Sequence, residues 1–358
     1  MSEAQTFVYE GYDSLDRFYD SDEDAEDEIT GEELMITHVI VHKYVHEVSN
    51  GMNMFENLRR VDFHPTVETI GHGAFEGCRF LEDVDLPISL ETIEDYAFEG
   101  TGLRTIVIPP KVKKIPKGCF ASCVQLEFAE LPEGIEYIDM KAFQNCHKLR
   151  RIKIPSTIKI SELEDDETHE ASWFWNCTKL ELVCLPSTLE KIPVFCFRDC
   201  SSLEYIQLQN GLKVFGRGAF MNSGLKRITI PPSVEDLGGG GYSTTGEAFL
   251  NCRHLQSVDL PEGLRCIPYE TFKGCSSLAS INLPESVDRI FGSAFADCIS
   301  LTCITIQAKH RCHIAADSFH GCVNVRTIKA SPAVLPLLLQ NMDRSTHNND
   351  TLCTVHFS

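Results

Sequence analysis

The sequence predicts a repeat solenoid: a right-handed coil with one curved parallel β-sheet, built from about 11–12 repeats of 22–23 residues. Three observations predict this fold class. A closing residue, usually proline, returns at a nearly constant interval. A phenylalanine returns at one place in each interval, and a segment of alternating apolar and polar residues precedes each closing residue. A fixed period of this length is the signature of stacked structural repeats.

The closing position defines the repeats. Most steps between successive closing residues are 22 or 23 residues long, and two steps carry about eight more, within 161–171 and 238–246. We interpret both longer steps as loop insertions, because the pattern resumes unchanged after each of them. The closing residues are Pro65, Pro87, Pro109, Pro132, Pro155, Pro186, Gln209, Pro231, Pro261, Pro284, Gln307 and Ala330.

Each repeat contains a predicted strand and a predicted return segment. Residues 149–155 read Leu-x-x-Ile-x-Ile-Pro, and this alternation is typical of a half-buried strand. The preceding Ile-x-x-x-Ala-Phe-x-x-Cys half turns the chain back and places its phenylalanine inside the coil. We expect these phenylalanines to stack as an aromatic spine: Phe75, Phe98, Phe120, Phe143, Phe174, Phe197, Phe220, Phe249, Phe272, Phe295 and Phe319.

A single repeat cannot fold alone. It buries roughly six apolar side chains at about 2 kcal/mol each, whereas ordering the backbone costs roughly 1–2 kcal/mol for every residue. Stacking buries both faces of each coil and pairs its strand with the next one, so stability depends on neighbours and the ends need caps. Parallel crossovers are right-handed, which predicts the hand of the coil.

The repeated pattern Leu-Pro-x-x-Leu-x-x-Ile-x-x-x-Ala-Phe-x-x-Cys-x-x-Leu resembles the BspA-like class of leucine-rich repeat, from about residue 36 to 330. The resemblance implies a leucine-rich-repeat solenoid, horseshoe-like, that binds proteins or surfaces and catalyses no reaction. Members occur on bacterial cell surfaces and in many unicellular eukaryotes. This sequence departs from the surface-anchored members, because it shows neither an export signal nor an anchor.

The predicted domains are a disordered acidic tail over 1–34, the solenoid over 35–330 with an opening cap at about 35–65, and a C-terminal cap over 331–358. Residues 36–41 read as an opening strand, 332–343 as a short helix and 351–357 as a final strand. The tail holds thirteen acidic residues against Arg17, so it carries −12 of the net charge of −20. It has little to bury, which predicts disorder.

Two interpretations of the acidic tail stay open. It acts as a solubilising segment, as blocks of like charge usually do, or as a docking segment for a basic partner. The second interpretation relies on the aromatic residues Tyr9, Tyr12, Phe18 and Tyr19, and on Ser21 as an acid-directed phosphorylation site. A related possibility is autoinhibition, in which the tail binds the basic cluster at residues 150–153.

Nine of the sixteen cysteines fall on one repeat position. Equivalent positions on adjacent coils lie about 5 Å apart, so we expect a buried ladder in which the thiols act as small apolar groups. The two repeats with Thr101-Gly102 and Ser223-Gly224 at this place are one residue shorter and have no cysteine there, which argues against obligatory disulfide pairing. Disulfides would also need export, and the sequence shows no export signal, so a reduced compartment is expected. The ladder cysteines are Cys78, Cys123, Cys146, Cys177, Cys200, Cys252, Cys275, Cys298 and Cys322.

No catalytic, cofactor or metal site is predicted. The pairs Cys119/Cys123 and Cys196/Cys200 occupy repeat positions and lack the tighter spacing usual for zinc. The glycine-rich stretch at 238–246 lacks the lysine of a phosphate loop. Trp173 and Trp175 either extend the spine or contribute to binding. Two histidine groups are also interpreted as structural: His38, His42 and His46, and His310 with Cys312 and His313.

The predicted function is a non-catalytic protein–protein interaction scaffold or adaptor, cytoplasmic or nuclear and monomeric, with a secreted or cell-surface adhesin as the alternative. The net charge of −20 argues against nucleic acid as a partner, and no apolar run is long enough to span a membrane. A protein partner should bind the outward positions of the sheet. The candidate partner-binding residues are Phe128, Glu130, Arg151, Lys153, Leu182, Tyr205, Gln207 and Arg227.

Overall fold

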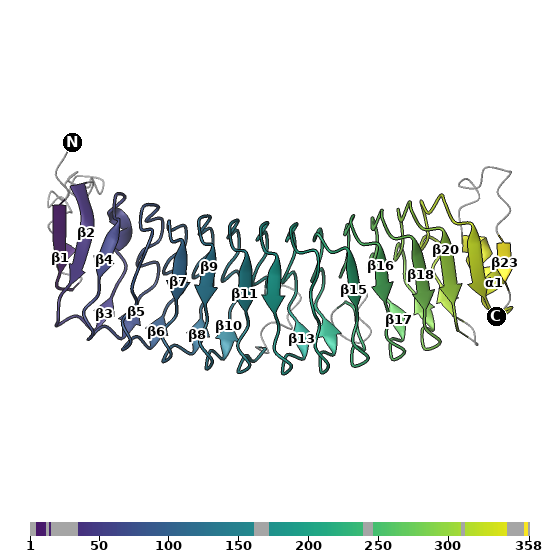
Figure 1. Cartoon of the computed structure of the whole chain (residues 1–358), viewed down its shortest axis with the longest axis horizontal. Coiled ribbons are helices and arrows are strands. Elements are labelled where there is room, and N and C mark those ends of the chain that lie inside the picture. Colours follow the sequence, from purple (N-terminus) through teal and green to yellow (C-terminus); the bar gives the residue numbers. More distant parts are fainter. Residues whose placement is uncertain are drawn as a thin grey trace, which may run out of the picture. The chain divides into compact units, whose positions relative to one another are not determined.

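The computed structural model describes residues 5–11, 14–15, 35–160, 172–238, 246–308, 312–341 and 354–356. It divides into two compact units: unit 1 is Met1–Lys159 with Asn176–Leu180, and unit 2 is Ile160–Trp175 with Glu181–Ser358. Within each unit the chain forms a parallel β-solenoid whose successive coils lie side by side (Figure 1). The predicted fold class is confirmed.

The longer strands of each unit form a row that we call the main row. Its strands pair in parallel, so Ile106 lies opposite Ala129 in unit 1 and Ile304 opposite Ile328 in unit 2. In unit 1 the row consists of β1 (Gln5–Tyr9), β2 (Ile36–Val41), β4 (Arg60–Asp62), β7 (Thr105–Val107), β9 (Phe128–Glu130) and β11 (Arg151–Lys153). In unit 2 it consists of β12 (Leu182–Cys184), β15 (Arg227–Thr229), β16 (Ser257–Asp259), β18 (Ser280–Leu283), β20 (Cys303–Ile306), β22 (Thr327–Ala330) and β23 (Thr354–His356).

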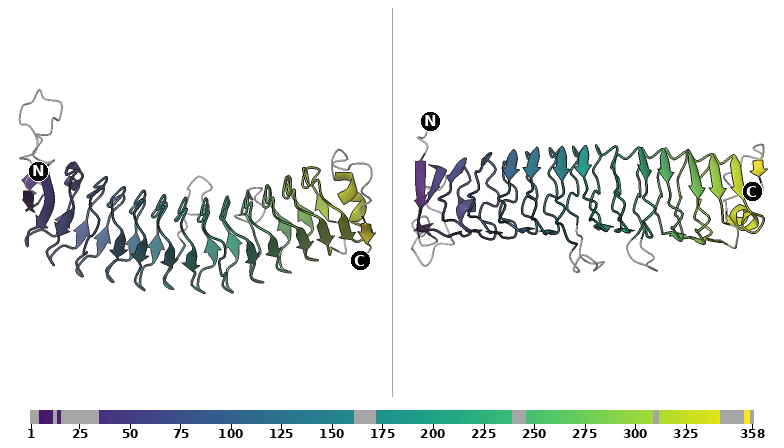
Figure 2. Two further views of the ribbon diagram at one scale, coloured as in Figure 1. Left: turned by 45° about the horizontal axis from the view of Figure 1, so that its top comes forward. Right: turned by 60° about the horizontal axis from the view of Figure 1, so that its bottom comes forward.

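Each unit also has a second row of two-residue strands, which the sequence analysis did not predict (Figure 2). In each of these strands one side chain enters the core and the other points outward. For example, Ile70 is buried and Thr69 points outward. Thr69 and Ile70 pair with Thr92 and Ile93 of the next coil. The second row consists of β3 (Glu47–Val48), β5 (Thr69–Ile70), β6 (Thr92–Ile93), β8 (Lys114–Ile115) and β10 (Tyr137–Ile138) in unit 1, and of β13 (Lys191–Ile192), β14 (Val214–Phe215), β17 (Cys266–Ile267), β19 (Arg289–Ile290) and β21 (His313–Ile314) in unit 2.

The predicted aromatic spine forms the core of both units. In unit 1 the rings from Phe75 to Phe143 stack with centroids 5.3–5.6 Å apart. In unit 2 the rings from Phe174 to Phe319 stack at 5.1–5.8 Å, with interplanar angles of 17° or less. These spacings lie within the roughly 4.5–7 Å range of favourable aromatic pairs. Within each stack, every ring between the two end rings therefore contacts the rings of the coils before and after it.

A left-handed residue precedes the cysteine position of every coil. Asn145 has φ 61°, Asn222 has φ 56° and Asp297 has φ 60°, while other coils use glycine, as at Gly77 and Gly321. Glycine adopts this conformation without steric cost, and asparagine and aspartate tolerate it better than other residues. This requirement explains why glycine, asparagine and aspartate recur before the cysteine position.

The N-terminal end differs from the prediction. Residues 5–9 were expected to be disordered, but they form β1, which pairs with β2 and buries Phe7 and Tyr9. The strand gains backbone pairing with β2, and Phe7 and Tyr9 gain contacts with the core. This stabilisation outweighs the unfavourable effect of the acidic residues that follow the strand. Tyr9 is 0% exposed, so it is not an anchor for a partner. Residues 10–11 and 14–15 are also described, and Leu15 is fully buried. The other aromatic residues of the segment, Tyr12, Phe18 and Tyr19, and also Ser21, lie outside the described residues.

The C-terminal elements agree with the prediction. The helix α1 (Leu335–Asn341) follows β22, and Leu338 is fully buried. The strand β23 then pairs in parallel with β22. The insertions at 161–171 and 239–245 lie outside the described residues.

The two short coils interrupt the main row. In each described coil, one segment occupies the place of a main-row strand. Two of these segments, 83–85 and 205–207, form no strand, and each of them precedes a short coil. In each short coil the glycine amide donates to a carbonyl of the coil before it: Gly102 to Cys78 at 3.3 Å and Gly224 to Cys200 at 3.1 Å. A Cβ at either glycine would overlap the backbone of the preceding coil. Glycine is therefore required at both positions.

Candidate functional site

The outward side chains of the main-row strands form an open surface that we call the main-row face. Along β11, Ile152 is 3% exposed and enters the core, whereas Arg151 and Lys153 are exposed. The same alternation holds in β7, β12 and β15. Because buried residues alternate with outward ones along each strand, neighbouring coils present their outward side chains in register.

In unit 1 the main-row face carries an aromatic and cationic group. Arg151 lies opposite Phe128 in the ladder, and its guanidinium carbon is 5.2 Å from the ring centroid of Phe128. Val107 is 58% exposed and lies opposite Glu130. An arginine that stacks on an aromatic ring retains hydrogen-bond donors for a partner, so this pair is suited to bind a carboxylate beside an apolar side chain.

Lys153 is engaged by its own unit. Its Nζ lies 2.9 Å from Glu133 Oε1, and the other oxygen of Glu133 accepts hydrogen bonds from the backbone N–H and hydroxyl of Ser156. The hydrogen bond from Lys153, and then those from Ser156, lower the pKa of Glu133 to about 2. The charge of Lys153 is therefore partly neutralised, and Arg151 is the more available cation of β11.

In unit 2 the main-row face carries few charged side chains. Leu182 is 54% exposed and Tyr205, on the next coil, is 55% exposed. Arg227 is exposed on the coil that follows. Asp259 accepts a hydrogen bond from the hydroxyl of Thr229 at 3.0 Å. Two large apolar side chains and one arginine thus dominate this part of the face.

The comparisons with known proteins agree with this geometry. The sequence profile described as BspA type leucine rich repeat region (6 copies) matches residues 47–166, 165–246 and 243–337. The chain belongs to this family. No curated protein matches the chain.

Solved structures of other repeat proteins have the same fold. A leucine-rich repeat protein from Bacteroides ovatus is 25% identical with a TM-score of 0.68, over 91% of this chain and 84% of that one. A leucine rich cell surface protein from Faecalibacterium prausnitzii is 24% identical with a TM-score of 0.51, over 89% and 82%. A leucine-rich repeat protein from Eubacterium ventriosum is 20% identical with a TM-score of 0.53, over 85% and 81%. The last two comparisons concern the fold alone.

The BspA-type repeat places all eight candidate binding residues on the main-row face. Seven are exposed, and Phe128 is half-buried beneath Arg151. Unit 1 brings together Phe128, Glu130, Arg151 and Lys153, and unit 2 brings together Leu182, Tyr205, Gln207 and Arg227. Their role in binding stays a prediction. Val107 lies on the same face, at a position that the strand pattern of the sequence places outward, but it was not among the candidate residues.

The cysteine ladder is buried as predicted, but its thiols do more than fill space. Each ladder thiol donates a hydrogen bond to a backbone carbonyl of the preceding coil, for example Cys275 to Phe249 at 3.2 Å. Burial raises the pKa of Cys78, Cys123 and Cys252 to about 12. Such thiols are poor nucleophiles, because the thiolate is the reactive form. The expectation that they act only as apolar groups was incomplete.

The remaining polar features of the described residues serve the fold. Trp173 is 1% exposed and lies edge-on to Phe174, whereas Trp175 donates to Asp199 at 2.8 Å. The Nε2 of His38 lies 2.9 Å from Asp62. The described part of the chain contains no group of three or more metal-binding side chains, and none of its helices is long and apolar enough to cross a membrane. His310 lies outside the described residues.

Proposed function

We propose that the protein is a non-catalytic interaction scaffold or adaptor that binds a protein partner on its main-row face. One observation carries this proposal: in a chain of net charge −20, few outward positions of unit 2 are charged. Only Arg227, Asp259 and Lys329 are charged among the outward positions from β12 to β22: Leu182, Cys184, Tyr205, Gln207, Arg227, Thr229, Ser257, Asp259, Ser280, Asn282, Cys303, Thr305, Thr327 and Lys329. Depletion of charge around exposed aromatic and arginine side chains is the composition of an interface core.

The proposal places the scaffold in a reducing compartment, the cytoplasm or nucleus. This is supported by the ladder thiols, since each must keep its S–H proton to donate to the carbonyl before it. A cell-surface adhesin is the second candidate, because the Faecalibacterium prausnitzii relative is called a cell surface protein. A membrane-impermeant maleimide that labels the exposed Cys184 in intact cells would favour the second candidate.

The test uses Arg151→Glu and Tyr205→Ala, separately and together. We expect each substitution to weaken the Kd for a specific partner about tenfold or more, because hot-spot residues contribute about 1–2 kcal/mol or more. The partner is captured from native lysate with the wild-type chain, and its affinity is then measured with each purified variant. The thermal unfolding temperature should stay within about 2 °C, since surface substitutions change stability little.

The matched control is Tyr44→Ala. Tyr44 is 73% exposed and lies between β2 and β3, away from the main-row face. It should leave the Kd unchanged. If Arg151→Glu and Tyr205→Ala bind the partner as tightly as the Tyr44 variant does, the main-row face is not the binding surface.

A further inference from the structure

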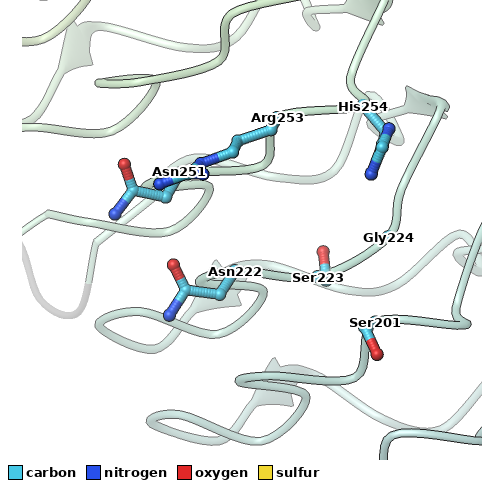
Figure 3. A pocket seen from close by; sticks show the side chains of 7 residues that line it. All are labelled: Ser201, Asn222, Ser223, Gly224, Asn251, Arg253 and His254. Atoms are coloured by element: carbon cyan, nitrogen blue, oxygen red, sulfur yellow. The ribbon is translucent and has the colours of Figure 1, made fainter.

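The short coil of unit 2 creates a hollow among the turns that contain the cysteine position of successive coils (Figure 3). Coils on either side have three residues between the left-handed turn residue and the next leucine, as in 200–202 and 252–254, whereas this coil has only Ser223 and Gly224. Its turn is therefore shorter than the turns that flank it. The resulting hollow has a volume of about 390 Å³.

The hollow cannot be filled by its own coil. A Cβ on Gly224 would overlap the carbonyl oxygen of Ser201 on the preceding coil. Ser223, which forms part of the lining, is 2% exposed, and its hydroxyl lies 3.4 Å from the Cys252 thiol. The backbone thus fixes a space that no neighbouring side chain occupies.

The open side of the hollow carries hydrogen-bond donors and positive charge. Arg253 and His254 are exposed and line it together with Asn222 and Asn251 from successive coils. Neither Arg253 nor His254 forms an ion pair with any residue that the structure describes. The nearby acid Asp199 is already engaged, since it accepts hydrogen bonds from Asn222 at 2.7 Å and from Trp175 at 2.8 Å.

We propose that this hollow binds one oxyanion, a carboxylate or phosphate group. Arginine binds both groups through paired N–H donors. The guanidinium of Arg253 is directed toward Asn251, and His254 lies on the other side of the view (Figure 3), so an uncharged amide and an imidazole add donors without adding negative charge. The volume lies near the lower end of the roughly 300–1,000 Å³ range of ligand sites, so a side chain or small molecule that carries the anion fits. This site is distinct from the main-row face and does not depend on the proposed function.

The test measures binding of inorganic phosphate, and of a short phosphoserine peptide, by calorimetry and ³¹P line broadening. The first variant is Arg253→Ser with His254→Ser, which gives the serines that the neighbouring coils have at 201–202 and 276–277. The second replaces Ser223-Gly224 by Cys-Ser-Ser, which restores the usual coil length and fills the hollow. We expect saturable binding to the wild-type chain and at least tenfold weaker binding to both variants.

The matched control is the same lengthening of the other short coil, at Thr101-Gly102 in unit 1, which should leave phosphate binding unchanged. If the lengthened variant of unit 2 fails to fold, the serine double variant decides alone.

Tighter binding of the peptide assigns the anion to a partner's side chain, and tighter binding of free phosphate assigns it to a small molecule. Absence of saturable binding, or equal binding by the wild type and the serine double variant, overturns the proposal. Tyr205→Ala should not affect phosphate binding, so failure of the main-row face leaves this result intact.

Discussion

At the residue scale, the ladder cysteines connect adjacent coils through backbone carbonyls. The carbonyl of Phe249 accepts one hydrogen bond from the Cys252 amide of its own coil at 3.1 Å and a second from the Cys275 thiol of the next coil at 3.2 Å. Alanine at this position would leave the second acceptor site unused. The short coil of unit 1 differs: the hydroxyl of Thr101 donates to Phe98 of its own coil at 2.9 Å, and Phe98 also accepts from the Cys123 thiol of the next coil at 3.1 Å.

The buried thiols predict a loss of stability at alkaline pH. Burial raises the pKa of Cys252 to about 12, whereas an unfolded cysteine titrates near 8.5. The folded state therefore binds the proton more tightly, and the stabilisation that it provides is complete below about pH 8.5 and is lost as pH rises toward about 12. From pH 8 to pH 10 this thiol should account for a loss of about 2 kcal/mol.

Cys252→Ser removes this titration and keeps a donor for the Phe220 carbonyl, to which the thiol donates at 3.0 Å. Urea unfolding of both proteins at pH 8 and pH 10 checks the prediction. The free-energy difference between wild type and variant should shrink by about 2 kcal/mol at the higher pH. Parallel losses in the two proteins would contradict it.

At the element scale, β1 closes the N-terminal end of unit 1. Tyr9 is fully buried, its carbonyl accepts from the His42 amide at 2.9 Å, and its hydroxyl accepts from the Ser49 amide at 3.4 Å. The first ordered strand thus precedes the acidic segment, which connects β1 to β2. Most acidic residues of positions 1–34 therefore lie between two strands of the solenoid in the sequence, where a tail that precedes the solenoid was expected.

Tyr9→Ala should open this end of the solenoid. Truncating a buried aromatic side chain costs about 3–5 kcal/mol, and in a repeat protein the effect falls mainly on the adjacent coils. We expect faster hydrogen exchange at the amides of His42 and Ser49, with exchange in β20 and β22 unchanged. Val8→Ala is the control, since Val8 is 44% exposed in the same strand. Slow exchange in the Tyr9 variant would show that β1 does not stabilise this end.

The elements differ in how far the sequence predicts them. Main-row strands are predicted because three or four alternating residues and a closing proline mark them, as in 149–155. The strands of the second row are not predicted, because a strand of two residues is too short to show a period. The pairing of these strands also depends on coils that the aromatic spine already holds together. β1 was missed because composition was averaged over 1–34, which hid the short apolar segment from Phe7 to Tyr9. The hollow was visible only as a missing residue at Ser223-Gly224, and its lining depends on the three-dimensional placement of the neighbouring coils.

At the scale of the whole molecule, stability comes from contacts between successive coils. Ion pairs also join neighbouring coils, such as Lys226 with Glu204 at 2.7 Å and Lys213 with Glu190 at 3.0 Å. These side chains are more than half exposed, and exposed pairs contribute only about 0–1 kcal/mol each. The aromatic spine within each unit, by contrast, contributes a stacked ring from every coil that carries a spine phenylalanine. Energetic coupling should therefore be strong between adjacent coils and weak between distant ones.

A comparison of two double-mutant cycles in unit 2 checks this prediction. Phe249 and Phe272 stack at 5.3 Å with an interplanar angle of 2°, and we expect Phe249→Leu and Phe272→Leu to show a coupling energy of about 0.5–1.5 kcal/mol. Phe197 and Phe295 share no stacked neighbour, so their leucine variants should add within about 0.5 kcal/mol. Urea unfolding of the six variants and the wild type supplies both cycles. Equal coupling in the two cycles would mean that the solenoid transmits strain along its length, and the nearest-neighbour account of its stability would then fail.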